Sequence, residues 1–296
     1  MNAETMECYK KAGRVASEAR DYCASLIENG AHILKVVEKT EKYITDKGAK
    51  PAFPVNISIN DIAAHFTPKH NDYDLVFSTG NVVKIDVGVH VDGCIGDTAT
   101  TVEIGTNNWK KLIDAAHEGL RVAINTIRPE IDLGLVGENI ERTIASFGYC
   151  PIRNLTGHSM NQYNLHAGIS IPNIRTRTSD TVNVGDVIAI EPFATNGGGK
   201  VKNDLRGNIY RLVKDKPMYD KKLEAMLEYI TKEFRTLPFA ERWCASKFDD
   251  AAVNLQKLVR SGVIMAYPIL KEVDDGVISQ MEHTVIITES GCEIIT

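Results

Sequence analysis

The strongest constraint on the fold is a short motif that occurs twice. Residues 80–86 (Gly-Asn-Val-Val-Lys-Ile-Asp) and 185–191 (Gly-Asp-Val-Ile-Ala-Ile-Glu) share glycine, Asn or Asp, valine, isoleucine and an acid, 105 positions apart. Each copy predicts a turn that enters an apolar strand and ends on a carboxylate. A general turn–strand preference explains one copy well but two copies poorly, because an unpaired buried acid is costly. We therefore expect two related halves whose acids, Asp86 and Glu191, face one site.

Hydrophobic spacing predicts helices around these strands. Apolar residues recur at helical spacing over residues 5–29, 33–46, 109–127 and 135–147. Strands are expected over 82–91 and 187–194 and within 277–295. Residues 208–267 are charged and helix-rich, and their texture differs from that of the rest of the chain.

The composition restricts the class of protein. The net charge of −5 is a mild acidic excess, whereas general nucleic-acid binding needs clustered Lys and Arg. No run approaches the roughly 20 apolar residues of a membrane span, and residues 1–20 lack the apolar core of a secretory signal. The six cysteines form no Cys-x-x-Cys pair and are expected to be reduced thiols. We expect a soluble, cytoplasmic protein that binds neither membranes nor nucleic acid.

A tight hairpin predicts that two aspartates share one face of a sheet. If residues 92–93 (Asp-Gly) form a two-residue turn, Gly88 lies opposite Asp97. Asp86 shares the face of Gly88 because strand side chains alternate, so the two aspartates are diagonal neighbours with Cα atoms roughly 7–8 Å apart. Singly, Asp97 is better explained as a strand-end cap and Asp86 as a partner of a turn backbone. Together they favour a divalent metal, because close buried like charges repel.

Three further side chains extend this set. His158 lies in Thr-Gly-His-Ser, Glu191 ends the second copy of the repeat, and Glu282 precedes an apolar run. A histidine by itself is more often structural than a ligand. Two Asp, two Glu and one His, however, suit Mn, Fe, Co or Zn in a site with open positions, and not a closed cysteine–zinc site. Two metals roughly 3.5–4 Å apart, bridged by carboxylates, would fit these donors.

Two more histidines are candidates for a site. His65 lies in Ala-Ala-His-Phe-Thr-Pro, and His166 follows His158 by eight positions. For either residue alone, a packed core histidine is the better interpretation.

Taken together, these passages resemble the type 2 methionine aminopeptidases of the M24 peptidase family, in the short archaeal form without an N-terminal extension. The resemblance covers essentially the whole chain. Each passage is weak alone, and the set is highly specific. The matching passages are Ala-Phe-Pro (52–54), Ala-His-Phe-Thr-Pro (64–68), Lys-Ile-Asp-Val-Gly (84–88), the stretch 92–98, Gly-His-Ser (157–159), His-Ala-Gly (166–168), Ile-Glu-Pro-Phe (190–193) and Gln-Met-Glu-His-Thr (280–284).

The resemblance implies the pita-bread fold, an α+β architecture whose two pseudo-symmetric halves form a curved antiparallel sheet with helices outside. It implies one catalytic domain over 1–296, with a helical insertion subdomain at 208–267 that type 1 enzymes and X-Pro dipeptidases lack. It also implies two divalent metal ions. Asp86 would bind one ion, His158 and Glu191 the other, and Asp97 and Glu282 would bridge them.

The implied activity is hydrolytic removal of the initiator methionine from nascent proteins whose second residue is small. The metals would lower the pKa of a bridging water, and Glu191 would carry its proton to the leaving amine. His65 and His166 would hydrogen-bond the substrate and the tetrahedral intermediate. The residues expected to line the methionine pocket are Phe53, Leu165, Ile209 and Tyr267. Many type 2 members have histidine at the position of Ile209 and asparagine at that of Thr156.

Two rival interpretations remain open at this point. An X-Pro dipeptidase would share the fold and the metals, but not the inserted block or the Phe53 pocket. An inactive pita-bread binding module would have lost metal ligands, whereas all five are present here. The resemblance implies peptides with N-terminal methionine and nascent proteins as partners, and a monomer. The sequence leaves open the physiological metal and any contact with the ribosome.

Overall fold

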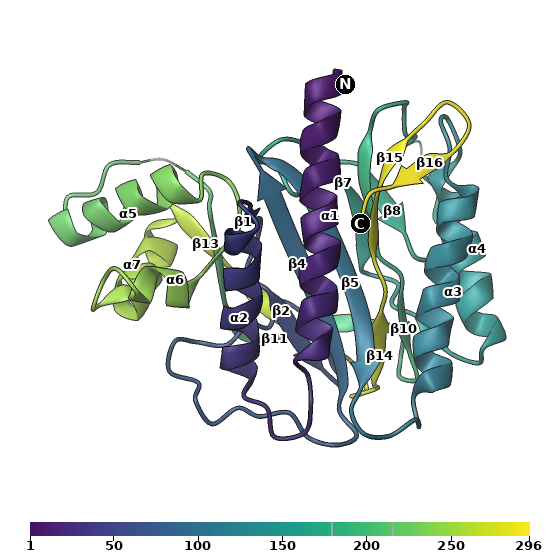
Figure 1. Cartoon of the computed structure of the whole chain (residues 1–296), viewed down its shortest axis with the longest axis horizontal. Helices are drawn as coiled ribbons and strands as arrows, with labels where there is room; N and C mark the ends of the chain where they lie inside the picture. Colours follow the sequence, from purple (N-terminus) through teal and green to yellow (C-terminus); the bar gives the residue numbers. More distant parts are fainter. Residues whose placement is uncertain (179, 215) are drawn as a thin grey trace.

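A computed structural model describes residues 1–178, 180–214 and 216–296, in which helices cover the outer faces of antiparallel sheets (Figure 1). In the first half, α1 and α2 lie over a sheet in which β4 pairs with β1, β2 and β5. The elements of this half are α1 (Ala3–Ser25), α2 (Ile33–Asp46), β1 (Lys50–Pro51), β2 (Asn56–Ile59), β3 (Ile62–Ala64), β4 (Val82–Val91) and β5 (Cys94–Glu103).

The second half repeats this plan. Its helices α3 and α4 cover a sheet with the strand order β16-β15-β9-β7-β8, beside a smaller sheet β14-β10-β6. Its elements are α3 (Lys110–Thr126), α4 (Leu133–Ser146), β6 (Cys150–Pro151), β7 (Thr156–Met160), β8 (Ser170–Pro172), β9 (Val187–Ile190), β10 (Phe193–Thr195), β14 (Ile278–Gln280), β15 (His283–Ile287) and β16 (Cys292–Ile294). The four helices predicted for the two halves are confirmed to within a few residues at each end.

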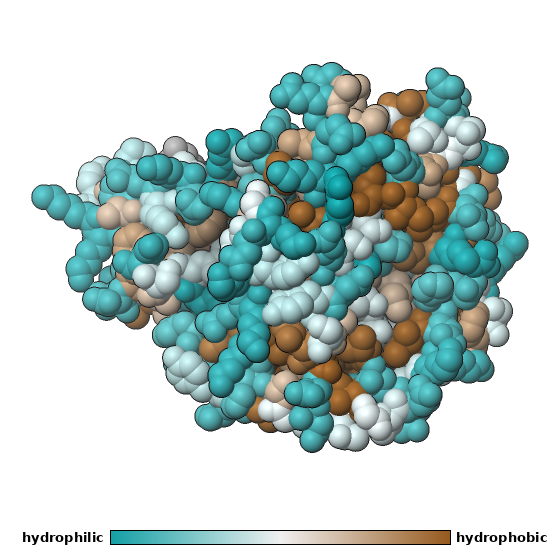
Figure 2. Space-filling model, viewed as in Figure 1, coloured by the Kyte–Doolittle hydropathy of each residue, from teal (hydrophilic) through white to brown (hydrophobic). Residues whose placement is uncertain are grey.

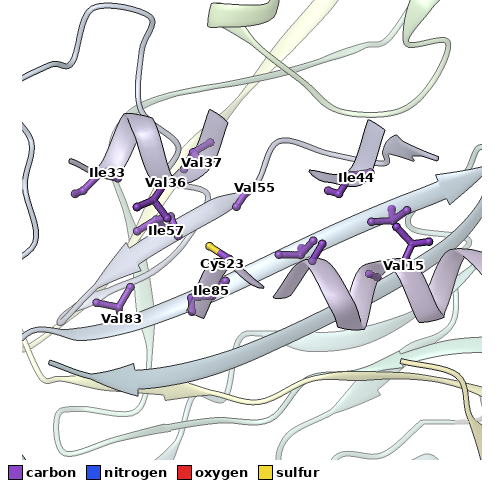
Figure 3. Packing of buried hydrophobic residues seen from close by; sticks show 14 of the residues in the cluster. Val15, Cys23, Ile33, Val36, Val37, Ile44, Val55, Ile57, Val83 and Ile85 are labelled. Carbon is purple, nitrogen blue, oxygen red and sulfur yellow. The ribbon is translucent and has the colours of Figure 1, made fainter. Parts of the chain in front are cut away.

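The core of the first half shows why β4 presents its acid inward. Val83 and Ile85 pack against apolar side chains of α1 and α2, including Val15 and Val36 (Figure 3). Because side chains alternate along a strand, the residues between them point to the other face of the sheet. That face carries Asp86 into the interior of the molecule. The second half has an equivalent core between α3, α4 and the strands β9 and β15.

The predicted hairpin is confirmed in its register. Val91 pairs with Cys94 and Gly88 with Asp97, so Asp86 stands two positions along from the partner of Asp97. The backbone of residue 92 has a positive φ of 45°, as tight two-residue turns require.

The two halves meet where β5 passes the junction of β14 and β15. Ala99 and Glu282 form an antiparallel bridge in which each N–H donates to the other's carbonyl, at 3.3 and 3.0 Å. Asp97 and Thr284 are also joined by two reciprocal hydrogen bonds, here through a side-chain hydroxyl. The Asp97 N–H donates to Thr284 Oγ1, and that hydroxyl donates to the Asp97 carbonyl, both at 2.8 Å. The metal-ligand candidates of the two halves are therefore fixed to one another by backbone contacts.

One strand predicted as continuous is interrupted, and the strands expected within 277–295 are divided at a similar break. The prediction of a strand over 187–194 is wrong at Glu191 and Pro192, where β9 ends before β10 begins. Pro192 has no N–H to donate to a ladder, and Glu191 turns out of the sheet at this break. The segment 277–295 is likewise divided into β14, β15 and β16, with Glu282 at the first break. Both breaks lie at candidate ligands, which periodicity alone does not reveal.

Between the strands of the second half, a two-stranded ribbon carries three helices. The strands β11 (Val201–Leu212) and β13 (Ile264–Glu272) pair with each other, with β12 (Phe239–Ala240) on one side and β3 on the other. The helices α5 (Lys221–Glu233), α6 (Glu241–Ala245) and α7 (Ala251–Ser261) follow in the lobe drawn at the left of Figure 1. The subdomain limits of 208–267 stay a prediction, and residue 215 within them lies outside the described residues.

The surface agrees with this layering. In Figure 2 the helices present mostly hydrophilic residues, and hydrophobic residues show mainly in the seam between α1 and α3. Among the described residues, no helix combines the length and the apolar character needed to cross a bilayer.

Gly13 in α1 provides a test of the contact between helix and chain end. A Cβ at this position would collide with the backbone carbonyl of Ile295. Gly→Ala in a helix ordinarily stabilises by about 0.5–1 kcal/mol. At Gly13 we expect the opposite sign, a loss of about 1–3 kcal/mol in the free energy of unfolding, because the added methyl overpacks the contact. Urea denaturation measures it.

Gly119 in α3 is the matched control. A Cβ there would meet side-chain atoms of Ile144 and Pro192 at 3.4 Å, an ordinary contact. Gly119→Ala should therefore leave stability unchanged or raise it. Equal effects of the two substitutions would show that the close approach of α1 to Ile295 is not maintained in solution.

Candidate metal centre

Five potential metal ligands converge from five places in the fold. Two come from the hairpin of the first half, Asp86 on β4 and Asp97 on β5. The second half supplies His158 from β7, Glu191 from the break after β9, and Glu282 from the break before β15. All five line one cavity of about 250 Å³.

The ligand atoms of these groups lie close enough together to bind the same ions. His158 Nε2 lies 3.8 Å from Asp97 Oδ2 and 4.0 Å from Glu191 Oε1. Ligand atoms of Asp97, His158 and Glu282 all lie within 4.8 Å of one another. Buried oxygens of Asp86 and Asp97 and the Nδ1 atom of His158 have no hydrogen-bond partner in the described part of the chain. Buried polar atoms are normally paired, so these orphaned atoms and this donor set fit divalent metal ions.

Burial and mutual repulsion shift the proton affinities of the carboxyl groups upward. Burial raises the pKa of Asp86 to about 7. The pKa of Asp97 lies well above its ordinary value, first through burial and then through the charges of Asp86 and Glu191. Glu191 and Glu282 have raised pKa values for the same two reasons. Burial, and then the neighbouring His166, lowers the pKa of His158 to about 3, which keeps the ring neutral as a metal ligand must be.

Three polar residues around the centre were not predicted as members of the site. Asn56 on β2 pairs directly with Asp86 in the sheet. Gln280 Nε2 donates to Glu191 Oε2 at 3.4 Å. Lys84 lies fully buried two positions before Asp86, and its Nζ donates to the carbonyls of Asn60 and Ile278 at 2.8 and 3.0 Å. For Lys84 the sequence held a signal, since it stands two positions from Asp86 on the same strand and so shares its face.

The two additional candidate histidines stand at the same cavity. The His65 ring meets Tyr267 edge-on with centroids 5.1 Å apart, and its Nδ1 lies 3.1 Å from the Pro268 carbonyl oxygen. His65 has a φ of 67°, which is rare for a residue with a side chain and is typical of residues held by their surroundings at a site. The His166 ring lies at the exposed rim, 4.4 Å from that of His158.

An apolar compartment opens beside these groups. The predicted pocket residues all line the cavity, and they are Phe53, Leu165, Ile209 and Tyr267. A Cβ on Gly88 would collide with the Phe53 ring. The glycine two positions after Asp86 is therefore needed to admit this aromatic wall. Pro238, which was not predicted, completes the compartment.

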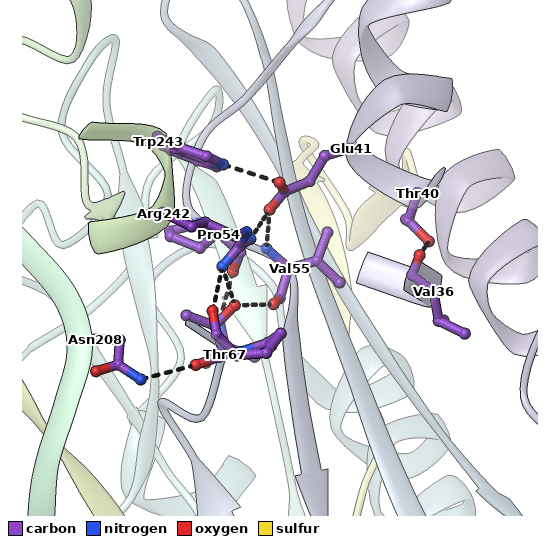
Figure 4. Close-up of polar contacts among 11 residues, drawn as sticks. Val36, Thr40, Glu41, Pro54, Val55, Thr67, Asn208, Arg242 and Trp243 are labelled. Atoms are coloured by element: carbon purple, nitrogen blue, oxygen red, sulfur yellow. Dashed lines mark hydrogen bonds and ion pairs between the residues drawn. The ribbon is translucent and has the colours of Figure 1, made fainter. Parts of the chain in front are cut away.

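A buried carboxylate supports the segments that carry Phe53 and His65 (Figure 4). Glu41 on α2 accepts a hydrogen bond from the Val55 N–H at 3.2 Å and from Trp243 Nε1 at 2.8 Å. It also forms an ion pair with Arg242 Nη2 of α6, and both side chains are largely buried.

Arg242 extends this support to the segment after His65. Its Nη1 donates to Thr67 Oγ1 at 2.7 Å and to the Pro68 carbonyl at 3.1 Å. The Thr67 hydroxyl in turn donates to the Val55 carbonyl at 2.8 Å, and Asn208 Nδ2 on β11 donates to the Thr67 carbonyl at 3.2 Å. The network ties α2, the two site segments and the helical lobe into one unit.

Two layered halves around a cluster of buried carboxylates and a histidine define a metallohydrolase of the pita-bread type. The chain belongs to metallopeptidase family M24, whose model matches residues 7–289. It is 46% identical over its full length to a methionine aminopeptidase of Methanocaldococcus jannaschii, and all of that relative is covered. It is 44% identical over its full length to a methionine aminopeptidase of Archaeoglobus fulgidus, again with complete coverage of both chains. The resemblance to the short archaeal form is confirmed.

Solved structures confirm the fold. A methionine aminopeptidase from Thermotoga maritima superimposes with a TM-score of 0.74 at 25% identity, covering 100% of this chain and 98% of that one. A thermophilic Arx1 gives 0.87 at 17% identity, with coverage of 100% and 91%. The prolidase from Pyrococcus furiosus gives 0.64 at 18% identity, and this chain covers 64% of its length. The predicted α+β pita-bread architecture is confirmed by these likenesses.

The raised carboxyl pKa values predict an unusual pH dependence for the metal-free protein. An acid whose pKa is higher in the folded state stabilises that state only while it stays protonated, so stability falls as the pH rises. Above pH 7, each carboxyl that stays protonated in the folded state and is ionised in the unfolded state contributes a slope of about −1.4 kcal/mol per pH unit. Lys84, whose pKa burial lowers to about 7, opposes this slope in the same window. Asp97, Glu191 and Glu282, whose pKa values lie well above their ordinary values, together outweigh Lys84, so we expect a net loss of stability.

Urea denaturation of chelator-treated protein at pH 7, 7.5, 8 and 8.5 measures that slope. Glutamine cannot ionise, so Glu282→Gln should make the slope less negative by about 1.4 kcal/mol per pH unit, the contribution of one proton. Divalent metal should stabilise the protein, and more so at pH 8.5, because it competes with the protons. A metal-free stability that rises with pH in this window, equally in both proteins, would contradict the buried carboxylate cluster.

The Glu41–Arg242 pair predicts a large mutational effect far from the metal ligands. Arg242→Met leaves the Glu41 carboxylate buried without its cation, which costs about 3–5 kcal/mol. Lys222→Met removes one partner of the exposed pair Lys222–Asp250 and should cost no more than about 1 kcal/mol. Denaturant midpoints of the two variants distinguish these cases. Similar midpoints would show that the Arg242 contacts contribute little.

Proposed function

We propose that this protein is a methionine aminopeptidase with a dinuclear metal centre, acting on polypeptides whose second residue is small. The observation that carries the proposal is the placement of five metal-ligand side chains and an apolar compartment in one cavity. The identity of 46% over the whole chain to a methionine aminopeptidase supports it. A cavity that accepts an apolar side chain beside a hydrolytic centre suits removal of an N-terminal methionine.

For the ligand roles we adopt those that the family resemblance implies. Asp86 would hold one ion, His158 and Glu191 the other, and Asp97 and Glu282 would bridge the two. When bound, such ions lower the pKa of a coordinated water and polarise the scissile carbonyl. The metals that suit these donors are Mn, Fe, Co and Zn.

Glu191 would move the proton. Its Oε1 lies beside His158 Nε2, and its Oε2 accepts from Gln280. A carboxylate held in this way can take a proton from the attacking water and deliver it to the nitrogen of the leaving amine. Gln280 fixes the orientation of the carboxylate for both transfers.

His65 would accept a hydrogen bond from the substrate. A carbonyl oxygen can only accept, so the contact with Pro268 places a proton on His65 Nδ1. Burial lowers the pKa of His65, so its Nε2 stays unprotonated and can accept from a peptide N–H. His166 at the rim would stabilise the developing charge of the tetrahedral intermediate. His166 as a whole reaches the solvent, but its ring packs beside that of His158. Desolvation of the ring, and then the charges of His65 and Arg211, lower the pKa of His166 to about 4.

The apolar compartment would hold the methionine side chain. Phe53, Leu165, Ile209 and Tyr267 would surround it, and Pro238 would limit its depth. We further propose that the lobe carrying α5, α6 and α7 is the type 2 insertion, because it supplies Ile209 and Pro238 to this compartment. The X-Pro dipeptidase alternative is disfavoured by the full-length relatives, whose name is methionine aminopeptidase.

The remaining proposals concern the setting of the enzyme. Peptides with N-terminal methionine and nascent proteins would be its substrates, and the cytoplasm its compartment. We propose a monomer that binds no nucleic acid, in keeping with the net charge of −5. Contact with the ribosome would bring the site to nascent chains.

Methionine release from Met-Gly-Met-Met tests the function. Protein loaded with Mn, Fe, Co or Zn should release methionine from this peptide and should not cleave Ala-Pro. Glu191→Gln should lower kcat by about 10²–10⁴-fold, the contribution of a positioned acid–base group. Asp97→Ala should abolish activity and reduce the bound metal measured by elemental analysis.

Glu118→Gln on the exposed face of α3 is the matched control, and it should keep the parent rate. Cleavage of Ala-Pro in preference to Met-Gly-Met-Met would select the dipeptidase. Folded protein that binds no metal and releases no methionine would select the binding module.

A further inference from the structure

A second hollow adjoins the metal cavity on the side of the helical lobe. Its volume is about 280 Å³. Four residues line both spaces, namely Leu165, His166, Pro238 and Tyr267. The second hollow is completed by Asn164, Arg211, Thr236 and Met265. Asn164, His166 and Arg211 are exposed, so this hollow leads from the reaction centre to the solvent.

Strand geometry explains why Arg211 reaches this hollow. Ile209 and Arg211 stand two positions apart on β11, and side chains at that spacing share a face. Arg211 pairs with Met265 on β13, so Met265 and Tyr267 present the same face of the ribbon. The opposite face carries Tyr210, which packs into the core of the helical lobe. One face of the ribbon therefore runs from the proposed methionine compartment to the outer hollow.

Arg211 is held in a defined position there. Its Nε donates to Met265 Sδ at 3.1 Å. Its two Nη groups make no hydrogen bond to the described residues, so they remain available for a ligand. Arg211 and His166 line the same hollow, so the charge of Arg211 acts at the rim of the metal cavity.

Arg211 differs in charge from the acidic side chains that line the two cavities. Among the described residues lining either hollow, Arg211 is the one lysine or arginine, and the acids are Asp86, Asp97, Glu191 and Glu282. Those four acids are the proposed ligands of divalent cations, whose charge offsets theirs. The charge that a bound polypeptide meets beyond the scissile bond is then positive.

We propose that Arg211 forms a subsite for a carboxylate on the third or fourth residue of the substrate polypeptide, and that the protein therefore favours acidic over basic residues there. The inference rests on the proposed aminopeptidase function. An extended chain advances about 3.3–3.6 Å per residue, and residues 209 and 211 lie roughly 6.6–6.8 Å apart along the strand. With methionine beside Ile209, the chain reaches Arg211 about two residues later.

Matched peptides test this subsite. The set is Met-Gly-Glu-Met, Met-Gly-Gln-Met, Met-Gly-Lys-Met and the same series varied at the fourth position, all with amidated C-termini to remove the terminal carboxylate. In the parent protein, kcat/KM should be about two- to fivefold higher for the Glu than for the Gln peptide, the range of an exposed ion pair, and lower still for Lys. The difference should lie in KM, because the contact is equal in ground and transition states.

Two variants assign the effect to Arg211. Arg211→Gln should abolish the preference and Arg211→Glu should reverse it, each judged from the ratio of kcat/KM for the Glu and Gln peptides within the same variant. Arg121→Gln, at an exposed site on α3, makes the same change in net charge and should keep the parental preference. Raising the ionic strength from about 0.01 to 0.5 M should weaken the preference by screening.

The outcomes separate this inference from the proposed function. Methionine release at equal kcat/KM from Glu, Gln and Lys peptides would overturn the subsite and leave the aminopeptidase in place. A preference that persists in Arg211→Gln would also overturn it. Release from none of the peptides, with any of the four metals, would overturn both.

Discussion

The structure depends on four carboxyl groups that are forced together inside one cavity. Burial raises the pKa values of Asp86, Asp97, Glu191 and Glu282, and repulsion by neighbouring carboxylates raises those of the last three further. A cation among them removes both penalties. Holding such a cluster requires a rigid scaffold. Reciprocal backbone hydrogen bonds between residues 99 and 282, and reciprocal bonds between the Asp97 backbone and the Thr284 hydroxyl, provide it by joining the two halves at the ligands themselves.

The way each half delivers its ligands is not symmetric. In the first half both aspartates stand within regular strands of one hairpin. In the second half Glu191 and Glu282 stand at breaks between strands. An interrupted ladder frees a residue from the alternation of a strand, so its side chain can be aimed. The duplicated motif therefore accounts for Asp86 and Glu191. In the second half, breaks in the strands bring Glu191 and Glu282 beside His158.

One face of the β11–β13 ribbon contributes to the site, and the opposite face packs into the helical lobe. Strands β11 and β13 bury Tyr210 in the lobe while they present Ile209, Arg211 and Tyr267 to the cavity. The pair Glu41–Arg242 fixes the lobe to the first half, next to the segments that carry Phe53 and His65.

Much of this protein was determined by the sequence alone. The repeat, the four main helices and the hairpin register are local patterns, and turn type and strand alternation put Asp86 and Asp97 on one face. Tertiary structure decided the rest. Glu41 and Arg242 are 201 positions apart, and no periodicity predicts that they meet. The strand breaks, the buried Lys84 and the cavity-facing Arg211 likewise follow from packing between distant elements, and packing overrides local propensity wherever a buried charge must find a partner.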